Sequence, residues 1–217
     1  MDRFLVKRPR TADAEACAKR PRASGLPVNL AVCAPVEAIC AAEKTALELF
    51  DAYPVDSWYD LGPYLHNRQL LFGPRPGSHR TPHEERMPPV LLSIFAEARA
   101  ALCAHSSHFA DVPEVPSGCA INRYEPTANK RGSGLGPHRD KGLWKPLVVG
   151  VTLVESREMA FGEWGPNGEA TRRHRITTQR GSVYAFRDEL YTRWFHESLK
   201  KGPTQKRTIY SITYRFL

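Results

Sequence analysis

The chain has 217 residues, 41% of them hydrophobic, which is enough for one globular domain with a sizeable core plus a short tail. Its formal net charge of +8 favours a polyanionic partner such as nucleic acid. No apolar run approaches the roughly 20 residues of a membrane span, the N-terminus lacks a signal-peptide pattern, and the five cysteines form no CxxC pair. We therefore expect an intracellular protein with reduced thiols and no membrane partner.

Residues 1–30 are expected to form a mostly disordered basic tail, with seven Lys and Arg against three Asp and Glu. The sequence KRPR occurs in it twice, at 7–10 and 19–22, which predicts a nuclear-import signal and nuclear localisation. The tail also carries an aromatic-aliphatic triplet between two cations, made of Arg3, Phe4, Leu5, Val6 and Lys7.

The second predicted region, residues 31–217, begins with helical patterns and ends with strands. Two segments with helical periodicity, 35–53 and 88–106, each open on proline, and a loop rich in Pro, Gly, His and Arg lies between them at 73–89. Two helices followed by short antiparallel strands predict an α+β fold, with a double-stranded β-helix (jelly-roll) core and two N-terminal supporting helices. Strands are expected at 67–73, 118–124, 147–154, 158–164, 171–178, 181–187, 192–198 and 207–216.

A metal site is predicted from three side chains. His138 and Asp140 are two residues apart, so on an extended segment they share a face. His196 lies far downstream in an apolar strand pattern. Two imidazoles and one carboxylate form the facial triad of non-haem Fe(II) oxygenases. His174 is the competing third ligand, but it lies in the strongly cationic sequence TRRHR, so His196 is preferred.

A 2-oxoglutarate co-substrate at such an iron needs a cation for its distal carboxylate, and the last strand offers candidates. Alternate residues of this strand share a face, so Arg207, Ser211, Thr213 and Arg215 point one way. Arginine suits bidentate carboxylate binding. The strand alternates polar and apolar residues, so either face could be the buried one.

These motifs, in order over roughly residues 60–217, resemble the AlkB family of Fe(II)/2-oxoglutarate dioxygenases. The resemblance rests on Asn122-Arg123-Tyr124 ahead of His138-Arg139-Asp140, then His196 and a final strand ending ITYRF. It implies that Asn122 and Tyr124 bind 2-oxoglutarate, and that the triad binds Fe(II), with dioxygen as the oxidant. The last strand departs from the family's Arg-x-Asn-x-Thr-x-Arg pattern, because Ile209 and Ser211 stand at its first two positions. Arg207 is therefore expected to supply the missing cation.

The tail strengthens the resemblance. Residues 1–7 are similar to the N-terminus of the mammalian AlkB-type demethylase of double-stranded DNA, whose Arg-Phe-Leu-Val-Lys segment docks on the replication sliding clamp. This implies that Arg3–Lys7 bind a sliding clamp as a short peptide. In the same protein basic residues just after the last metal histidine grip the duplex, and Lys200 and Lys201 stand there.

The implied activity is oxidative demethylation of alkylated bases in nucleic acid, in DNA repair, by a monomer. The target base must leave its stack, so His138 is expected on one of its faces and Trp144, Phe161 or Trp164 on the other. Phosphate contacts are expected from cations that flank the iron motifs. These are Lys130, Arg131, Arg139, Lys141, Arg172, Arg173, Arg175, Lys200, Lys201 and Lys206.

Three alternatives remain open at the level of the sequence. One is an oxygenase that hydroxylates 5-methylpyrimidines, which releases no formaldehyde. Another is an RNA demethylase. The third, from a different class, is a clamp-tethered nucleic-acid-binding module without catalysis, which iron-dependent oxidation of 2-oxoglutarate would exclude.

Overall fold

The structure is a computed structural model that describes residues 26–61, 67–74, 80–126, 133–140, 143–201 and 205–217, without the side chains of Lys200 and Lys201. The clamp-binding and nuclear-import motifs of the tail lie outside the described residues, as do Lys130, Arg131 and Lys141. None of the described helices is long and apolar enough to cross a membrane.

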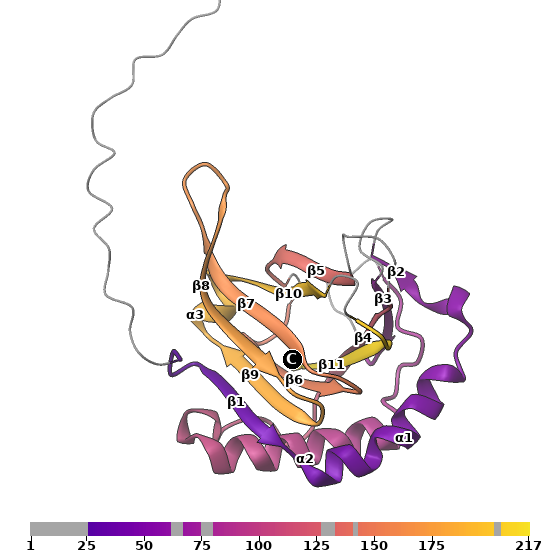
Figure 1. Cartoon of the computed structure of the whole chain (residues 1–217). Coiled ribbons are helices and arrows are strands. Elements are labelled where there is room, and N and C mark those ends of the chain that lie inside the picture. Colours follow the sequence, from indigo (N-terminus) through magenta and orange to yellow (C-terminus); the bar gives the residue numbers. More distant parts are fainter. Residues whose placement is uncertain (1–25, 62–66, 75–79, 127–132, 141–142, 202–204) are drawn as a thin grey trace, which may run out of the picture.

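Two antiparallel sheets face each other and enclose the interior of the molecule (Figure 1). The larger has seven strands in the order β1-β9-β6-β11-β4-β3-β2, and the smaller has four in the order β5-β10-β7-β8. Strands of the larger sheet are β1 (Leu30–Pro35), β2 (Tyr59–Asp60), β3 (Asn67–Phe72), β4 (Gly118–Tyr124), β6 (Leu147–Leu153), β9 (Ser182–Arg187) and β11 (Ile209–Arg215). Those of the smaller sheet are β5 (Ser133–His138), β7 (Arg157–Trp164), β8 (Ala170–Thr178) and β10 (Phe195–Lys201).

Two long helices cover the larger sheet on the side away from the smaller one (Figure 1). Their apolar faces join the main core together with alternate residues of the sheet, which stabilises the fold by removing apolar surface from water. The helical elements are α1 (Glu37–Asp51), α2 (Pro89–His105) and α3 (Glu189–Thr192), with short 3₁₀ helices at Val55–Ser57 and Ser107–Phe109.

Strand β11 separates the helix-covered core from the interior between the sheets. Tyr210, Ile212 and Tyr214 belong to the core under the helices, and the Tyr214 hydroxyl donates a hydrogen bond to the carbonyl of Leu91 in α2 at 2.7 Å. Ser211, Thr213 and Arg215 alternate with them and line a pocket between the sheets. Both faces of this strand are therefore covered, the apolar one by helices and the polar one by the opposite sheet.

Strand β6 has the same division. Val149 and Val151 pack in the core under the helices, whereas Thr152 lines the pocket. On the pocket face, Gly150 leaves room for the ring of Tyr184, because a Cβ there would lie only 2.0 Å from a ring carbon. The absence of a side chain at Gly150 thus lets Tyr184 form part of the pocket wall.

The α+β jelly roll predicted from the sequence is confirmed, with local differences. Strands β1 and β5 were not expected; β5 contains Gly134, Gly136 and Pro137, residues typical of turns. It is a strand because it pairs with β10, with register shifts along the ladder. Thr192, expected to begin the next-to-last strand, is the last residue of α3 instead, and β10 starts at Phe195.

Candidate metal centre

The three predicted metal ligands converge at one end of the pocket. His138 is the last residue of β5, Asp140 follows two residues later, and His196 lies in β10. Strand pairing sets His196 directly opposite His138, and their ring centroids are 4.3 Å apart. One candidate ligand atom from each of the three side chains lies within 4.8 Å of the others. A single ion can therefore contact all three.

The protonation of the histidines suits metal binding. Nδ1 of His138 lies 2.8 Å from the carbonyl oxygen of Gly136, which can only accept, so Nδ1 donates to it and Nε2 is the atom left to bind a metal. Burial lowers the pKa of His196 to about 3, which keeps that imidazole neutral. The Nε2 atoms lie 4.0 Å (His138) and 3.9 Å (His196) from the carboxylate oxygens of Asp140.

The carboxylate of Asp140 is held ionised by an arginine on β11. Burial alone raises its pKa, but the positive charge of Arg215 outweighs this and lowers the pKa to about 2. The contact is a 2.7 Å hydrogen bond from Nη2 of Arg215 to Oδ2 of Asp140. Two imidazoles and one carboxylate are the donor set that Fe(II) takes in facial-triad oxygenases, so the residues fit the iron that the sequence implies.

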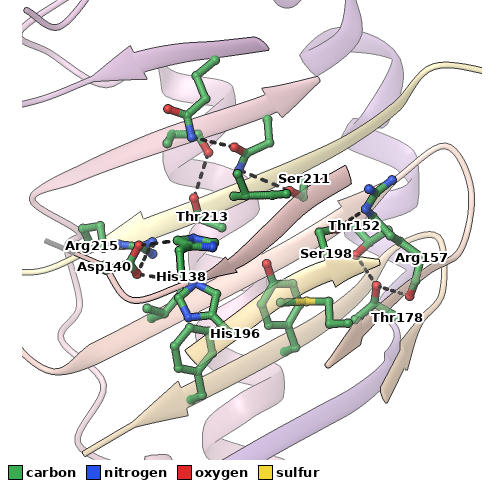
Figure 2. Close-up of a pocket in the computed structure, with 18 of the residues that line it drawn as sticks. His138, Asp140, Thr152, Arg157, Thr178, His196, Ser198, Ser211, Thr213 and Arg215 are labelled. Carbon is green, nitrogen blue, oxygen red and sulfur yellow. Dashed lines mark hydrogen bonds and ion pairs between the residues drawn. The ribbon is translucent and has the colours of Figure 1, made fainter. Parts of the chain in front are cut away.

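A pocket of about 90 Å³ extends from these ligands between the two sheets, well above the roughly 10–15 Å³ that one water requires. Figure 2 shows the triad and Arg215 at one end and Arg157 with three hydroxyl side chains at the other. The pocket can thus hold a small elongated ligand with one end at the metal. The hydroxyls at the far end belong to Thr152, Thr178 and Ser198.

The other predicted co-substrate residues lie along this pocket. Asn122 donates to the hydroxyl of Ser211 at 3.4 Å and accepts from Gln69 at 2.7 Å. Gln69 in turn accepts from Arg80 at 3.0 Å. Gln69 was not foreseen from the sequence, although it lies within an expected strand, because only the pairing of β3 with β4 sets it opposite Asn122.

The expectation that Arg207 faces the co-substrate was wrong. Arg207 is exposed and does not line the pocket. Strand β11 begins only at Ile209, so the alternation of inward residues does not extend back to position 207. The side chain of Gln205 donates to the carbonyls of Tyr124 and Arg207, at 2.7 and 2.9 Å. These bonds hold the segment that precedes β11 beside β4. In addition to Arg215, Arg157 lines the pocket, and no local pattern in the sequence singles it out.

The three aromatic candidates for stacking on a base have different environments. Trp144 is half-buried and lines the pocket. Phe161 is fully buried and packs against Phe186 and the ring of His196, as a core residue. Trp164 is 42% exposed and packs against Phe195. Of the three, only Trp144 lines the pocket that the metal ligands also line.

The predicted phosphate-binding cations that the structure describes are exposed, but some are engaged by carboxylates. Arg172 forms a bidentate ion pair with buried Glu197, in which Nη2 donates to Oε2 at 3.0 Å. Arg173 pairs with exposed Glu163 at 3.2 Å. Arg139, Arg175 and Lys206 are also exposed. His174, the rejected ligand candidate, stacks on Trp194 and is not part of the metal cluster.

Comparisons with solved structures identify the fold. The chain is similar to the structure titled "The structure of OsALKBH1", with a TM-score of 0.61, 16% sequence identity, and coverage of 88% of this chain and 99% of the other. It also matches a Pseudomonas putida prolyl-4-hydroxylase, with a TM-score of 0.49, 13% identity, and coverage of 87% and 93%. No protein-family model and no curated protein matches the sequence. The first of these matches supports the jelly-roll fold.

Proposed function

We propose that this protein is an Fe(II)/2-oxoglutarate-dependent dioxygenase that oxidatively demethylates alkylated bases in nucleic acid, in DNA repair. The observation that carries the proposal is the convergence of His138, Asp140 and His196 at one end of a polar pocket inside a jelly roll. The AlkB-type motifs around Asn122 and Tyr124, and the similarity in fold to OsALKBH1, support the choice of nucleic acid over other substrates.

The residues of the chain have separable roles in this reaction. His138, Asp140 and His196 would hold Fe(II), and Arg215 keeps Asp140 ionised and oriented. When bound, Fe(II) with dioxygen and 2-oxoglutarate supplies the oxidation that turns an N-methyl group into a hydroxymethyl group, which leaves as formaldehyde, while 2-oxoglutarate becomes succinate and carbon dioxide. Phe186, whose ring packs against His196, limits the access of bulk water to the metal end of the pocket, and Met159 adds apolar surface farther along it.

The charge of the described surface supports a nucleic-acid substrate. Arg139 follows a metal ligand directly, and Arg175 is exposed on β8, next to the strand that pairs with β10. Cations close to a metal centre can hold phosphates while a base enters the pocket. Lys200 and Lys201 belong to the same proposed track, although their side chains lie outside the described part of the chain.

Mass spectrometry of methylated oligonucleotides tests the proposal. The protein is incubated with Fe(II), ascorbate and 2-oxoglutarate, and with single- or double-stranded DNA, or RNA, carrying an N-methylated base. The expected result is loss of the methyl group with one formaldehyde and one succinate per event. Gain of a single oxygen on a 5-methylpyrimidine without formaldehyde would replace this function with C-hydroxylation. Absence of succinate with every substrate would contradict a dioxygenase.

The proposal extends to the tail. Residues 3–7 are proposed to bind a replication sliding clamp, and the two KRPR sequences to direct the protein to the nucleus. A segment with Phe, Leu and Val between cations suits a shallow apolar groove with an acidic rim.

A further inference from the structure

The pocket contains a buried cation that the metal site does not use. Arg157, the first residue of β7, is 2% exposed and is among the largest fully buried side chains. Its guanidinium carbon lies 3.4 Å from the centroid of the Tyr124 ring, which belongs to the opposite sheet. The side chain therefore reaches across the interior between the two sheets.

The hydrogen bonds of Arg157 hold its position but do not neutralise it. Nε donates to the hydroxyl of Ser198, and Nη2 donates to the carbonyl of Ser133 at 3.0 Å. Nη1 is buried and has no hydrogen-bond partner among the described residues, and no described carboxylate forms an ion pair with the group. Both partners are neutral, so the charge remains uncompensated.

A buried guanidinium without a counter-ion is costly, because arginine does not lose its proton under physiological conditions. Burial lowers the pKa of Arg157, and Tyr124 and Tyr184 offset this only in part. A bound anion removes this cost, and a carboxylate matches the fork of a guanidinium in shape. The free Nη1 supplies a donor for it.

The position of Arg157 suits an anion that also reaches the metal. Arg157 and the triad line the same pocket, at opposite ends (Figure 2). Arg215 is engaged by Asp140 and Arg207 is exposed, so neither is free to meet a carboxylate at the far end. In addition, Ile209 of β11 pairs with Tyr124 of β4, and the Arg157 guanidinium lies on the ring of Tyr124. Arg157 therefore places a cation close to Ile209, where the last strand itself has an apolar residue.

We propose that Arg157 binds the distal carboxylate of 2-oxoglutarate, so that the co-substrate spans the pocket from the metal triad to β7. This inference rests on the proposed function. Ser198 is then a positioning residue that orients the guanidinium through Nε, and the Tyr124 ring supports its flat face. The final strand contributes no cation to that end of the co-substrate.

The test compares two 2-oxo acids that differ at the distal end. Calorimetric titration of the Mn(II)-loaded protein gives the Kd of 2-oxoglutarate and of 2-oxobutyrate, which lacks the distal carboxylate. Arg157→Met is expected to weaken the binding of 2-oxoglutarate by about 30-fold or more. This factor is at the low end of the loss of affinity seen when one partner of a buried charge pair is removed. Its Kd for 2-oxobutyrate and its affinity for Mn(II) stay at the wild-type values. Arg207→Met, the matched control, leaves all three unchanged.

The outcomes separate the inference from the proposed function. If the wild type binds neither acid in the presence of Mn(II), the proposed function fails and the inference with it. If it binds 2-oxoglutarate and Arg157→Met does so equally well, the inference alone fails. If Arg157→Met does not fold, Ser198→Ala provides the test. A loss of affinity for 2-oxoglutarate alone supports the assignment, whereas wild-type Kd values for both acids overturn it.

Discussion

The two ends of the pocket are built in different ways. At the metal end, two ligands are two residues apart and the third lies on the strand paired with β5. At the other end, Arg157 comes from the smaller sheet and meets Tyr124 from the larger one, and Thr152 of β6 donates to Thr178 of β8 at 2.8 Å. The first end follows from chain spacing and strand pairing, whereas the second exists only once the sheets have packed face to face.

Asp140→Ala, which removes a ligand at the metal end of the pocket, has the largest expected effect. Removal of the carboxylate takes away one ligand and leaves Arg215 without its partner. Turnover of 2-oxoglutarate to succinate should fall to background, measured by chromatography of the products. The control is Asp111→Ala, which removes an exposed carboxylate that pairs with Arg187 and should keep full activity. Full turnover by Asp140→Ala would show that the triad is assigned wrongly.

At the opposite end, Arg157→Met should uncouple stability from co-substrate binding. Without ligand, its free energy of unfolding should equal the wild-type value or exceed it by about 1–4 kcal/mol, because an uncompensated buried charge is replaced by an apolar side chain. In the presence of Mn(II) and 2-oxoglutarate at 100 times the wild-type Kd, the wild type should gain about 2.7 kcal/mol. Urea denaturation measures both. An equal gain by the variant contradicts the assignment.

Gly150→Ala should disturb the pocket wall between the two ends. The new Cβ would overlap the ring of Tyr184, so that ring must move, at a cost of about 1–3 kcal/mol in unfolding free energy. Gly136→Ala is the matched control, because a Cβ there has no atom within 4 Å, and it should stay within about 0.5 kcal/mol. Thermal or urea denaturation distinguishes them, and equal stabilities would contradict the packing described for Tyr184.

Outside the pocket, Arg175→Ala should weaken DNA binding to a similar extent for all sequences and reduce the slope of log K against log salt by about 1. Fluorescence anisotropy at several salt concentrations measures the slope. Lys44→Ala, an exposed cation on α1 on the helix-covered side, should leave it unchanged. If both variants behave alike, the exposed cations of β8 do not form a phosphate track.

Phe4→Ala is expected to have the smallest effect on catalysis. It should remove binding to a sliding clamp, measured by surface plasmon resonance with the full chain, and leave demethylation of free oligonucleotides unchanged. A short peptide that becomes ordered on binding gives weak and transient association. Undiminished clamp binding, or lost activity on free oligonucleotides, would contradict this division between tail and domain.

The sequence predicts the metal end of the pocket well because its signals are local. The spacing of His138 and Asp140 needs only an extended segment, and the helices and most strands follow from periodicity. The strand β5 escapes detection because its glycines and proline read as a turn, and pairing with β10 overrides that preference.

The far end of the pocket could not be predicted in this way. Arg157 follows a turn that includes Val154 at φ 76°. It stands between the polar residues Ser156 and Glu158, so the sequence predicts an exposed charge. Its burial depends on how the start of β7 faces the larger sheet, which no local pattern records. The prediction for Arg207 fails because it assumes that the last strand begins at residue 207, two residues before its actual start at Ile209.

The most direct measurement is a crystal structure of the protein with Mn(II) and 2-oxoglutarate in the absence of oxygen. We expect one metal ion bound by His138, Asp140 and His196, the 2-oxo acid end of the co-substrate on that ion, and the distal carboxylate on Arg157. A metal bound by other residues, or a distal carboxylate on Arg207 with Arg157 left unpaired, would contradict it.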